Sequence, residues 1–276
     1  MTTPPEVPLA GGGMGGAVRV GDTVRRTAGP WTSTIHRLLT HLRAHGLTEV
    51  PRPLLLDEHR DEQHTDEPHS LDDQGREVLS YLDGVVPHYP LPAWVWADDV
   101  LVDAGRLLAA VHRASASFDL GGATWQMPTH EPVEVVCHND LAPYNMVFRE
   151  GRLVGLIDWD TASPGPRAWD LAYLAYRLVP LTDPTNHDGL PSPLAERARR
   201  LALLCTAYDG DLTPDEVLPT TVERLRDLAA FTRDRATTDG AHLEDHARLY
   251  ERDARWVVEH ATEISPADWP STREGA

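Results

Sequence analysis

The order of apolar and polar positions divides the chain into a part rich in short strands and a longer part rich in helices. Short apolar runs separated by turn residues predict four strands, over residues 6–9, 17–20, 23–26 and 77–82. Apolar side chains recur at helical spacing over residues 31–42, and Gly46 ends that run, which predicts one helix. This first part is therefore expected to form a small antiparallel sheet with a single helix.

The remainder of the chain combines one predicted hairpin with several helices. Residues 146–148 and 153–157 are two short apolar strands, and Glu150-Gly151 supplies the turn between them. A stripe at helical spacing is expected to be buried, and it consists of Leu101, Ala104, Leu108 and Val111. Later helices are predicted to begin after Pro193, at the capping box Thr213-Pro214-Asp215-Glu216, and to cover residues 243–257.

Polar side chains suited to phosphoryl transfer gather around this hairpin. Asp140 and Asn145 share the loop before it, where Pro143 argues against a helix, and Asp158 follows its second strand. Because the two strands have similar lengths, Asn145 and Asp158 are expected at the same end of the hairpin. Their oxygens are hard ligands of the kind that Mg²⁺ binds, and Asp140 is placed to take a proton from an acceptor hydroxyl.

The stretch from Val136 to Ala172 resembles the catalytic core of the aminoglycoside phosphotransferase family, within the protein-kinase-like superfamily. That family carries a His-Gly-Asp-Leu-x-x-x-Asn loop, an Ile-Asp strand end and an Asp-hydrophobic-Ala helix. This chain has HNDLAPYN, LIDWD and WDLA in the same order. The resemblance implies that Asp140 is the catalytic base, that Asn145 and Asp158 bind Mg²⁺, and that ATP or GTP is the phosphoryl donor.

The same resemblance implies that His138 is the structural histidine of the loop and that Asp170 braces the loop. Asn139 stands where glycine is commoner in the family, and asparagine tolerates unusual backbone angles. From the residues alone, Asp170 is equally consistent with an acid at the start of a helix. Asp160 is either a third metal ligand or a solvated loop acid.

Two segments of the first part are candidates for contact with the nucleotide. The glycine-rich segment at residues 11–16, which includes Gly13, is typical of a loop whose N–H groups approach phosphates, and also of a flexible connector. By resemblance, the backbone of Ser80, Tyr81 and Leu82 meets the edge of the adenine ring.

The chain contains no lysine, and its 25 basic residues are all arginine. Kinase-like enzymes normally hold the nucleotide phosphates with a strand lysine that is paired to a helix glutamate. Arg26 is the predicted substitute and Arg25 the alternative, because neighbouring strand residues face opposite sides of a sheet. No glutamate lies between Trp31 and Gly46, so the usual ion pair is expected to be absent.

Composition narrows the class of protein. The net charge of −18 argues against a nucleic-acid partner; it suits a cationic substrate, or solubility alone. No segment has the length of an uncharged membrane span, no signal peptide is visible, and two cysteines make no disulfide framework, so the cytoplasm is the expected location. Residues 57–73 are expected to form a solvated loop, with a metal site at His64 and His69 as the alternative.

The sequence thus predicts an α+β, protein-kinase-like fold with two lobes. A small antiparallel-sheet lobe is expected over residues 1–84 and a larger, mainly helical lobe over residues 85–276. The expected activity is phosphoryl transfer from ATP or GTP to a hydroxyl of a small molecule, with cationic, antibiotic-like compounds as one class of acceptor.

A catalytically degenerate kinase-like protein that binds or confers immunity is the alternative, since the resemblance extends to toxin-immunity relatives. A protein kinase is disfavoured because Ala142 stands where protein Ser/Thr kinases carry lysine. The sequence predicts neither the identity of the acceptor nor the oligomeric state.

Overall fold

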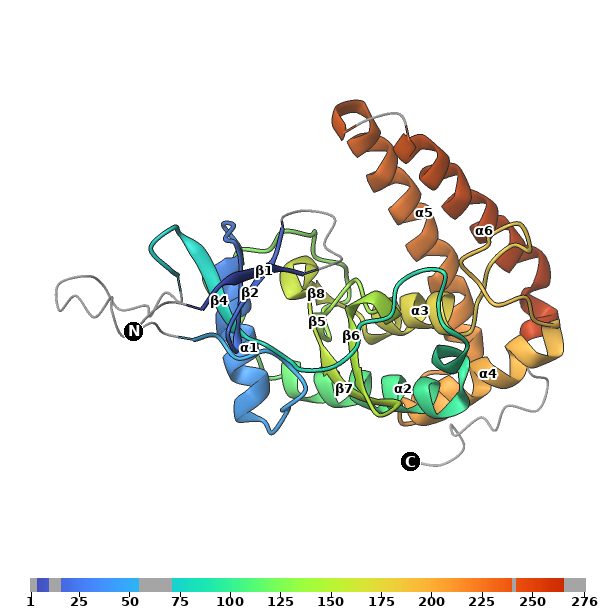
Figure 1. Cartoon of the computed structure of the whole chain (residues 1–276). Coiled ribbons are helices and arrows are strands. Elements are labelled where there is room, and N and C mark those ends of the chain that lie inside the picture. Colours follow the sequence, from blue (N-terminus) through green and yellow to red (C-terminus); the bar gives the residue numbers. More distant parts are fainter. Residues whose placement is uncertain (1–3, 10–15, 55–70, 240–241, 266–276) are drawn as a thin grey trace.

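A small sheet with one helix and a larger helical body lie side by side, joined by a single crossing of the chain (Figure 1). This computed structural model describes residues 4–9, 16–54, 71–239 and 242–265. The α+β class and the arrangement in two lobes predicted from the sequence are confirmed. The boundary between residues 84 and 85 stays a prediction.

The sheet of the smaller lobe is antiparallel, with the strand order β1-β2-β3-β4. Its strands are β1 (Glu6–Pro8), β2 (Val18–Val20), β3 (Thr23–Thr27) and β4 (Arg76–Ser80). The register places Arg26 of β3 opposite Glu77 of β4. Helix α1 (Thr32–Ala44) buries its apolar face, as its spacing predicts. All four predicted strands are therefore present, each within a few residues of its expected ends.

Among the described residues, the larger lobe contains two short two-stranded sheets, five α-helices and three short 3₁₀ helices. Strand β5 (Val135–Cys137) pairs with β8 (Ser163–Gly165), and β6 (Met146–Arg149) pairs with β7 (Arg152–Leu156) as the predicted hairpin. The helices are α2 (Asp98–Ser115), α3 (Arg167–Leu178), α4 (Leu194–Ala207), α5 (Pro214–Asp239) and α6 (His242–Ile264).

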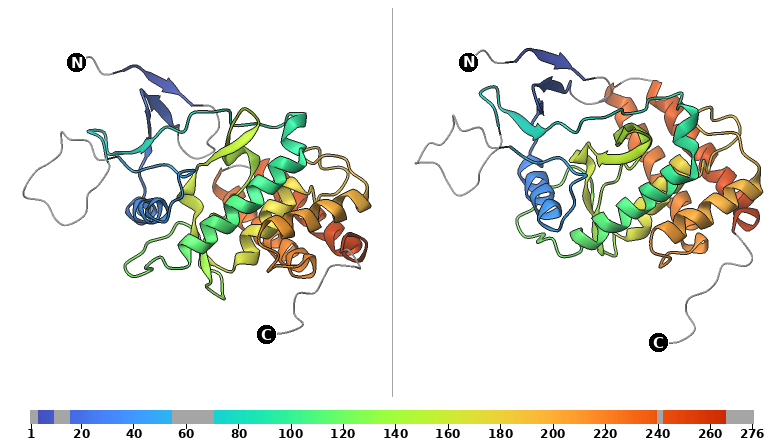
Figure 2. Two further views of the ribbon diagram at one scale, coloured as in Figure 1. Left: turned by 90° about the horizontal axis from the view of Figure 1, so that it is seen from below. Right: turned by 60° about the horizontal axis from the view of Figure 1, so that its bottom comes forward.

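Helices α2 and α3 carry the centre of the hydrophobic core. The predicted stripe of α2 is at most 1 % exposed at each of its four positions. Helices α5 and α6 form a long antiparallel pair that packs against α3 and extends beyond the rest of the lobe (Figures 1 and 2). Within the described residues, none of these helices has the length and apolar composition required to span a bilayer.

The segment that crosses between the lobes packs directly against the β6–β7 hairpin. The Val85 N–H donates to the Phe148 carbonyl (2.7 Å), and the Phe148 N–H donates back to the Val85 carbonyl (2.8 Å). Gly84, immediately before this pair, has a φ of +156°, and a Cβ there would lie 2.6 Å from the Phe148 carbonyl oxygen. Glycine is therefore required for the crossing to approach β6 so closely.

We expect Gly84→Ala to lower the free energy of unfolding by about 2–6 kcal/mol, because overpacking and backbone strain each cost roughly 1–3 kcal/mol. Urea denaturation of the full chain measures this change. Gly16→Ala is the matched control, since a Cβ at Gly16 meets no atom of the described residues within 4 Å. Equal denaturation midpoints for the two variants would contradict the steric role of Gly84.

Candidate active site

The loop between β5 and β6 holds Asp140 and Asn145 in direct contact. The side-chain amide of Asn145 donates from Nδ2 to the Asp140 carbonyl oxygen and to Asp140 Oδ2, at 2.9 Å in each case. A short 3₁₀ turn begins at Pro143 in this loop, where only a non-helical loop was expected. The difference has a simple cause, since proline is tolerated at the first position of a helical turn.

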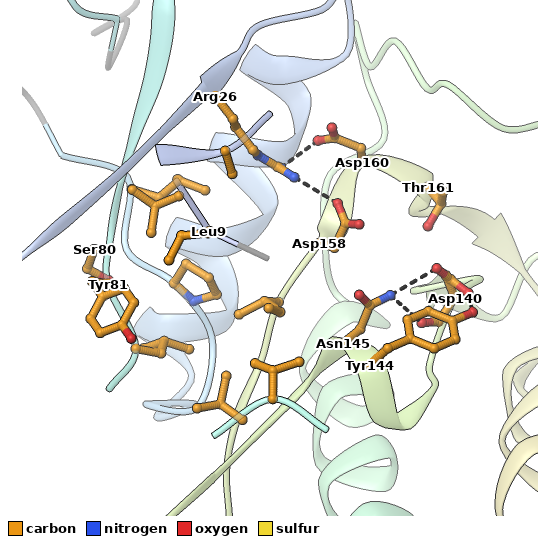
Figure 3. Close-up of a pocket in the computed structure, with 18 of the residues that line it drawn as sticks. Leu9, Arg26, Ser80, Tyr81, Asp140, Tyr144, Asn145, Asp158, Asp160 and Thr161 are labelled. Carbon is orange, nitrogen blue, oxygen red and sulfur yellow. Dashed lines mark hydrogen bonds and ion pairs between the residues drawn. The ribbon is translucent and has the colours of Figure 1, made fainter. Parts of the chain in front are cut away.

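Asp158 reaches the same region from the far end of β7. The Ile157 N–H donates to the Asn145 carbonyl (2.9 Å), which ties the two ends of the hairpin together as its strand lengths predict. Asp158 adopts a left-handed backbone (φ 64°), and its side chain is 43 % exposed. Figure 3 shows Asp140, Asn145 and Asp158 facing one pocket from neighbouring segments.

A buried carboxylate holds the beginning of the loop over residues 138–145, which we call the catalytic loop after its predicted role. Asp170, on the first turn of α3, is 0 % exposed and accepts the N–H groups of His138 (2.6 Å to Oδ2) and Asn139 (2.8 Å to Oδ1). Nε2 of His112 on α2 lies 3.2 Å from Oδ2. Burial alone would raise the pKa of Asp170, but these donors hold it below its ordinary value. The structure thus places Asp170 both at a helix start and beneath the loop.

His138 and Asn139 connect the catalytic loop to the segment after β7. His138 is 0 % exposed; its Nε2 lies 3.0 Å from the Ile157 carbonyl, and its Nδ1 accepts from the Asp140 N–H (3.3 Å). Asn139 has a φ of 67°, an angle that asparagine tolerates. Its Nδ2 donates to the Thr161 carbonyl and to Ser163 Oγ, each at 2.8 Å, a link that glycine at this position does not make.

Arg26 projects from β3 into the pocket, whereas Arg25 faces Asp72 on the other side of the sheet. The Arg26 guanidinium contacts three carboxylates: Nε donates to Glu77, while its two terminal nitrogens donate to Asp158 and Asp160 at 2.7 Å each (Figure 3). Burial by itself would lower the pKa of Arg26, but these three negative charges raise it. The guanidinium is therefore a permanent cation on the pocket wall.

Arg26 has a glutamate partner that was not predicted from the sequence. Glu77 of β4 is 1 % exposed and pairs with Arg26, whereas the usual pair joins a strand lysine to a helix glutamate. Helix α1 contributes His36, whose Nε2 lies 2.9 Å from Glu77 Oε2. The strand register sets Arg26 opposite Glu77, so predicting this pair would have required the register in advance. No sequence pattern indicates the contact of His36 with Glu77.

Asp160 is not a solvated loop acid. Its side chain is 22 % exposed and contacts Arg26. Burial raises its pKa to about 6, although the charge of Arg26 acts in the opposite direction. A role of Asp160 in binding a metal stays a prediction. Its carboxylate contacts the same guanidinium as Asp158, the predicted metal ligand.

The pocket is a cleft of about 460 Å³ between the lobes, and it joins an apolar half to a charged half. Its apolar half includes Val24, Leu79 and Val147, next to the predicted adenine contacts Ser80, Tyr81 and Leu82. The Tyr81 N–H donates to the Asp22 carbonyl (2.8 Å), whereas the Leu82 N–H has no acceptor among the described residues. The Leu82 N–H is therefore the donor in this segment that a flat ring could use.

The residues present fit a divalent metal ion. Asn145 is 4 % exposed, and because its Nδ2 is engaged with Asp140, its Oδ1 is left to face the cleft beside the Asp158 carboxylate. One amide oxygen and one carboxylate are enough protein ligands for Mg²⁺, which retains several waters and binds phosphate oxygens.

Three residues that the sequence suggested for nucleotide or metal binding lie outside the part of the chain that the structure describes. These residues are Gly13, His64 and His69. At the end of the acidic segment, Asp72 is 5 % exposed and accepts from the Gln74 and Arg76 N–H groups, so this residue is not solvated as expected.

Comparison with known sequences identifies the family. Residues 122–210 match the model of the phosphotransferase enzyme family. The trifolitoxin immunity protein of Rhizobium leguminosarum bv. trifolii is 33% identical over 210 residues, which are 74% of this chain and 74% of that protein.

Comparison with solved structures gives the same fold at low sequence identity. A choline/ethanolamine kinase family protein from Mesorhizobium loti superposes with a TM-score of 0.62 at 16% identity, over 95% of this chain and 92% of that one. The ADP-bound aminoglycoside phosphotransferase APH(2'')-Ib superposes with a TM-score of 0.55 at 12% identity, over 96% and 95% of the two chains. The chain therefore belongs to the aminoglycoside phosphotransferase (APH) family of phosphotransferase enzymes.

Proposed function

We propose that this protein transfers the γ-phosphoryl group of ATP or GTP to a hydroxyl group of a small molecule. One observation carries the proposal: Asp140, Asn145, Asp158 and Arg26 line a single cleft whose other half is apolar. That half is flanked by the Leu82 N–H, which has no acceptor in the part of the chain that the structure describes. A base, two oxygen ligands for a metal and a phosphate-binding cation are the parts that phosphoryl transfer needs. A protein that only binds a ligand requires no positioned base.

Asp140 acts on the acceptor in this proposal. Its carboxylate is part-buried at the charged end of the cleft, and Asn145 Nδ2 fixes its orientation through Oδ2. It orients the acceptor hydroxyl toward the γ-phosphorus and takes the hydroxyl proton as the new P–O bond forms. The bond from the γ-phosphorus to the β,γ-bridging oxygen breaks in the same step, and ADP or GDP leaves. Because the acceptor oxygen is held within reach of the phosphorus, much of the barrier is removed by positioning alone.

The other charged residues act on the nucleotide. Asn145 and Asp158 would hold Mg²⁺, which would supply positive charge to offset that of the phosphates. Arg26 supports the phosphates, while Glu77 and His36 fix the position of Arg26. These fixed charges favour the extra negative charge that develops on the phosphoryl oxygens.

The acceptor is proposed from charge and relatives rather than from a bound ligand. The net charge of −18 favours a cationic compound through long-range attraction. The name of the relative from Rhizobium leguminosarum favours a second candidate function, immunity to a toxin. The two are compatible if the protein inactivates the toxin by phosphorylation; a purely binding immunity protein is the remaining alternative.

Asp140→Asn is expected to lower phosphoryl transfer by roughly 10²–10⁴-fold, the usual contribution of a general base. The measurement is transfer of ³²P from Mg-ATP or Mg-GTP to a panel of hydroxylated amines, macrolides and peptides. Nucleotide affinity of the variant should stay close to wild type, since Asp140 does not contact the phosphates in this proposal. Nucleotide binding by wild type with transfer to no acceptor would support the binding-only alternative instead.

Arg26→Gln is expected to raise the Kd of a fluorescent ATP analogue roughly tenfold, because a charge-assisted hydrogen bond contributes about 1.5–3 kcal/mol. Arg26→Lys should recover part of this affinity, since it keeps the charge. Arg25→Gln is the matched control: the same residue type on the same strand faces Asp72 instead of the cleft. A similar loss of affinity in both Gln variants would rule out a specific role for Arg26.

A further inference from the structure

A tyrosine of the catalytic loop contacts the proposed base directly. The Tyr144 hydroxyl donates to Asp140 Oδ1 at 2.6 Å, the oxygen that Asn145 Nδ2 does not contact (Figure 3). Tyr144 also lines the cleft. Each oxygen of the Asp140 carboxylate therefore accepts one hydrogen bond from a side chain of its own loop.

The Tyr144 hydroxyl is the last member of a chain that begins at a buried cation. Arg177 donates to the Tyr173 oxygen from Nε (3.1 Å) and from a terminal nitrogen (3.0 Å), and the Tyr173 and Tyr144 oxygens lie 3.0 Å apart. A guanidinium can only donate, so the Tyr173 oxygen accepts from it. The Tyr173 proton is then free for Tyr144, and the Tyr144 proton points to Asp140. The direction of every bond follows from Arg177.

Both phenols remain protonated donors in this environment. Burial raises the pKa of Tyr144 well above its ordinary value, and burial likewise raises the pKa of Tyr173, with the charge of Arg177 acting in the opposite direction. Neither hydroxyl is therefore expected to compete with Asp140 as a base at neutral pH.

Arg177 is anchored by aromatic rings rather than by a carboxylate. Its side chain is 9 % exposed, and its guanidinium carbon lies within 6.0 Å of the ring centroids of four tyrosines, namely Tyr89, Tyr144, Tyr173 and Tyr176. Among the ion pairs of the described residues, none involves Arg177. Its charge is stabilised by the faces of these rings and is directed through the Tyr173 hydroxyl.

We infer that Tyr144 is a positioning residue for Asp140, and that Tyr173 and Arg177 fix the direction in which Tyr144 donates. Together with Asn145, Tyr144 prevents rotation of the Asp140 carboxylate and leaves a lone pair on each oxygen for the acceptor hydroxyl. This inference rests on the proposed function, because it gives Tyr144 a role only if Asp140 serves phosphoryl transfer. No part of the family motif quoted above marks position 144, 173 or 177.

The test uses water as the acceptor, so that no identified substrate is needed. Phosphate release from Mg-ATP is measured for wild type, Tyr144→Phe, Tyr173→Phe, Asp140→Asn and the double variant Tyr144→Phe/Asp140→Asn. Tyr176→Phe is the matched control: this ring also packs on Arg177, but its hydroxyl donates to Asp253 (2.8 Å). Affinity for a fluorescent ATP analogue and the melting temperature are measured for each protein.

Tyr144→Phe is expected to lower kcat roughly tenfold with little change in KM for ATP, because it removes one of the two groups that orient the base. Tyr173→Phe should have a smaller effect, since it leaves the Tyr144–Asp140 bond in place, and Tyr176→Phe should leave kcat unchanged. In the Asp140→Asn background, Tyr144→Phe should have no further effect, because Tyr144 acts through Asp140.

Two results would overturn the inference alone: an active wild type with Tyr144→Phe and Tyr176→Phe equally affected, or a tenfold loss that persists in the Asp140→Asn background. A wild type that binds the ATP analogue and releases no phosphate, with transfer to no acceptor of the panel, would instead overturn the proposed function, and the role of Tyr144 with it.

Discussion

The buried carboxylate of Asp170 is the constraint on which the site depends. It accepts hydrogen bonds from the N–H groups of His138 and Asn139, and it lies next to His112. The start of the catalytic loop is therefore fixed to α3 through Asp170, which is itself in contact with α2 through His112. Leaving a buried carboxylate or two buried N–H groups without partners costs several kcal/mol, so the loop has one favoured path. That path directs Asp140 into the cleft. Without it, the hairpin could still form, but Asp140 would have no fixed position relative to Asp158.

Negatively charged side chains surround Arg26 at the charged end of the cleft. Three carboxylates, from Glu77, Asp158 and Asp160, share this one guanidinium, and His36 adds a contact to Glu77. An arginine on the wall of the cleft and a strand glutamate behind it thus stand in place of the usual lysine and helix glutamate. In the proposed function Arg26 is the cation that binds the phosphates, a role that the planar guanidinium suits.

Features that depend on residues close together in the sequence could be predicted, whereas contacts between distant segments could not. The hairpin and the positions of Asn145 and Asp158 at one end of it follow from local strand lengths, so the sequence predicts them. The partner of Arg26 depends on the register between β3 and β4, which the alternation of apolar residues does not specify. The contact between Tyr144 and Tyr173 joins a loop to a helix, and no local pattern encodes such a pair.

The most direct measurement is a crystal structure of the full chain with Mg²⁺ and a non-hydrolysable ATP analogue. We expect a metal ion coordinated by Asn145 Oδ1 and the Asp158 carboxylate, Arg26 against the phosphates, and the adenine next to Leu82. Asp140 should keep its contact with Asn145 and face the γ-phosphate. A nucleotide bound outside this cleft, or a metal ion held without Asn145 and Asp158, would contradict the proposed site.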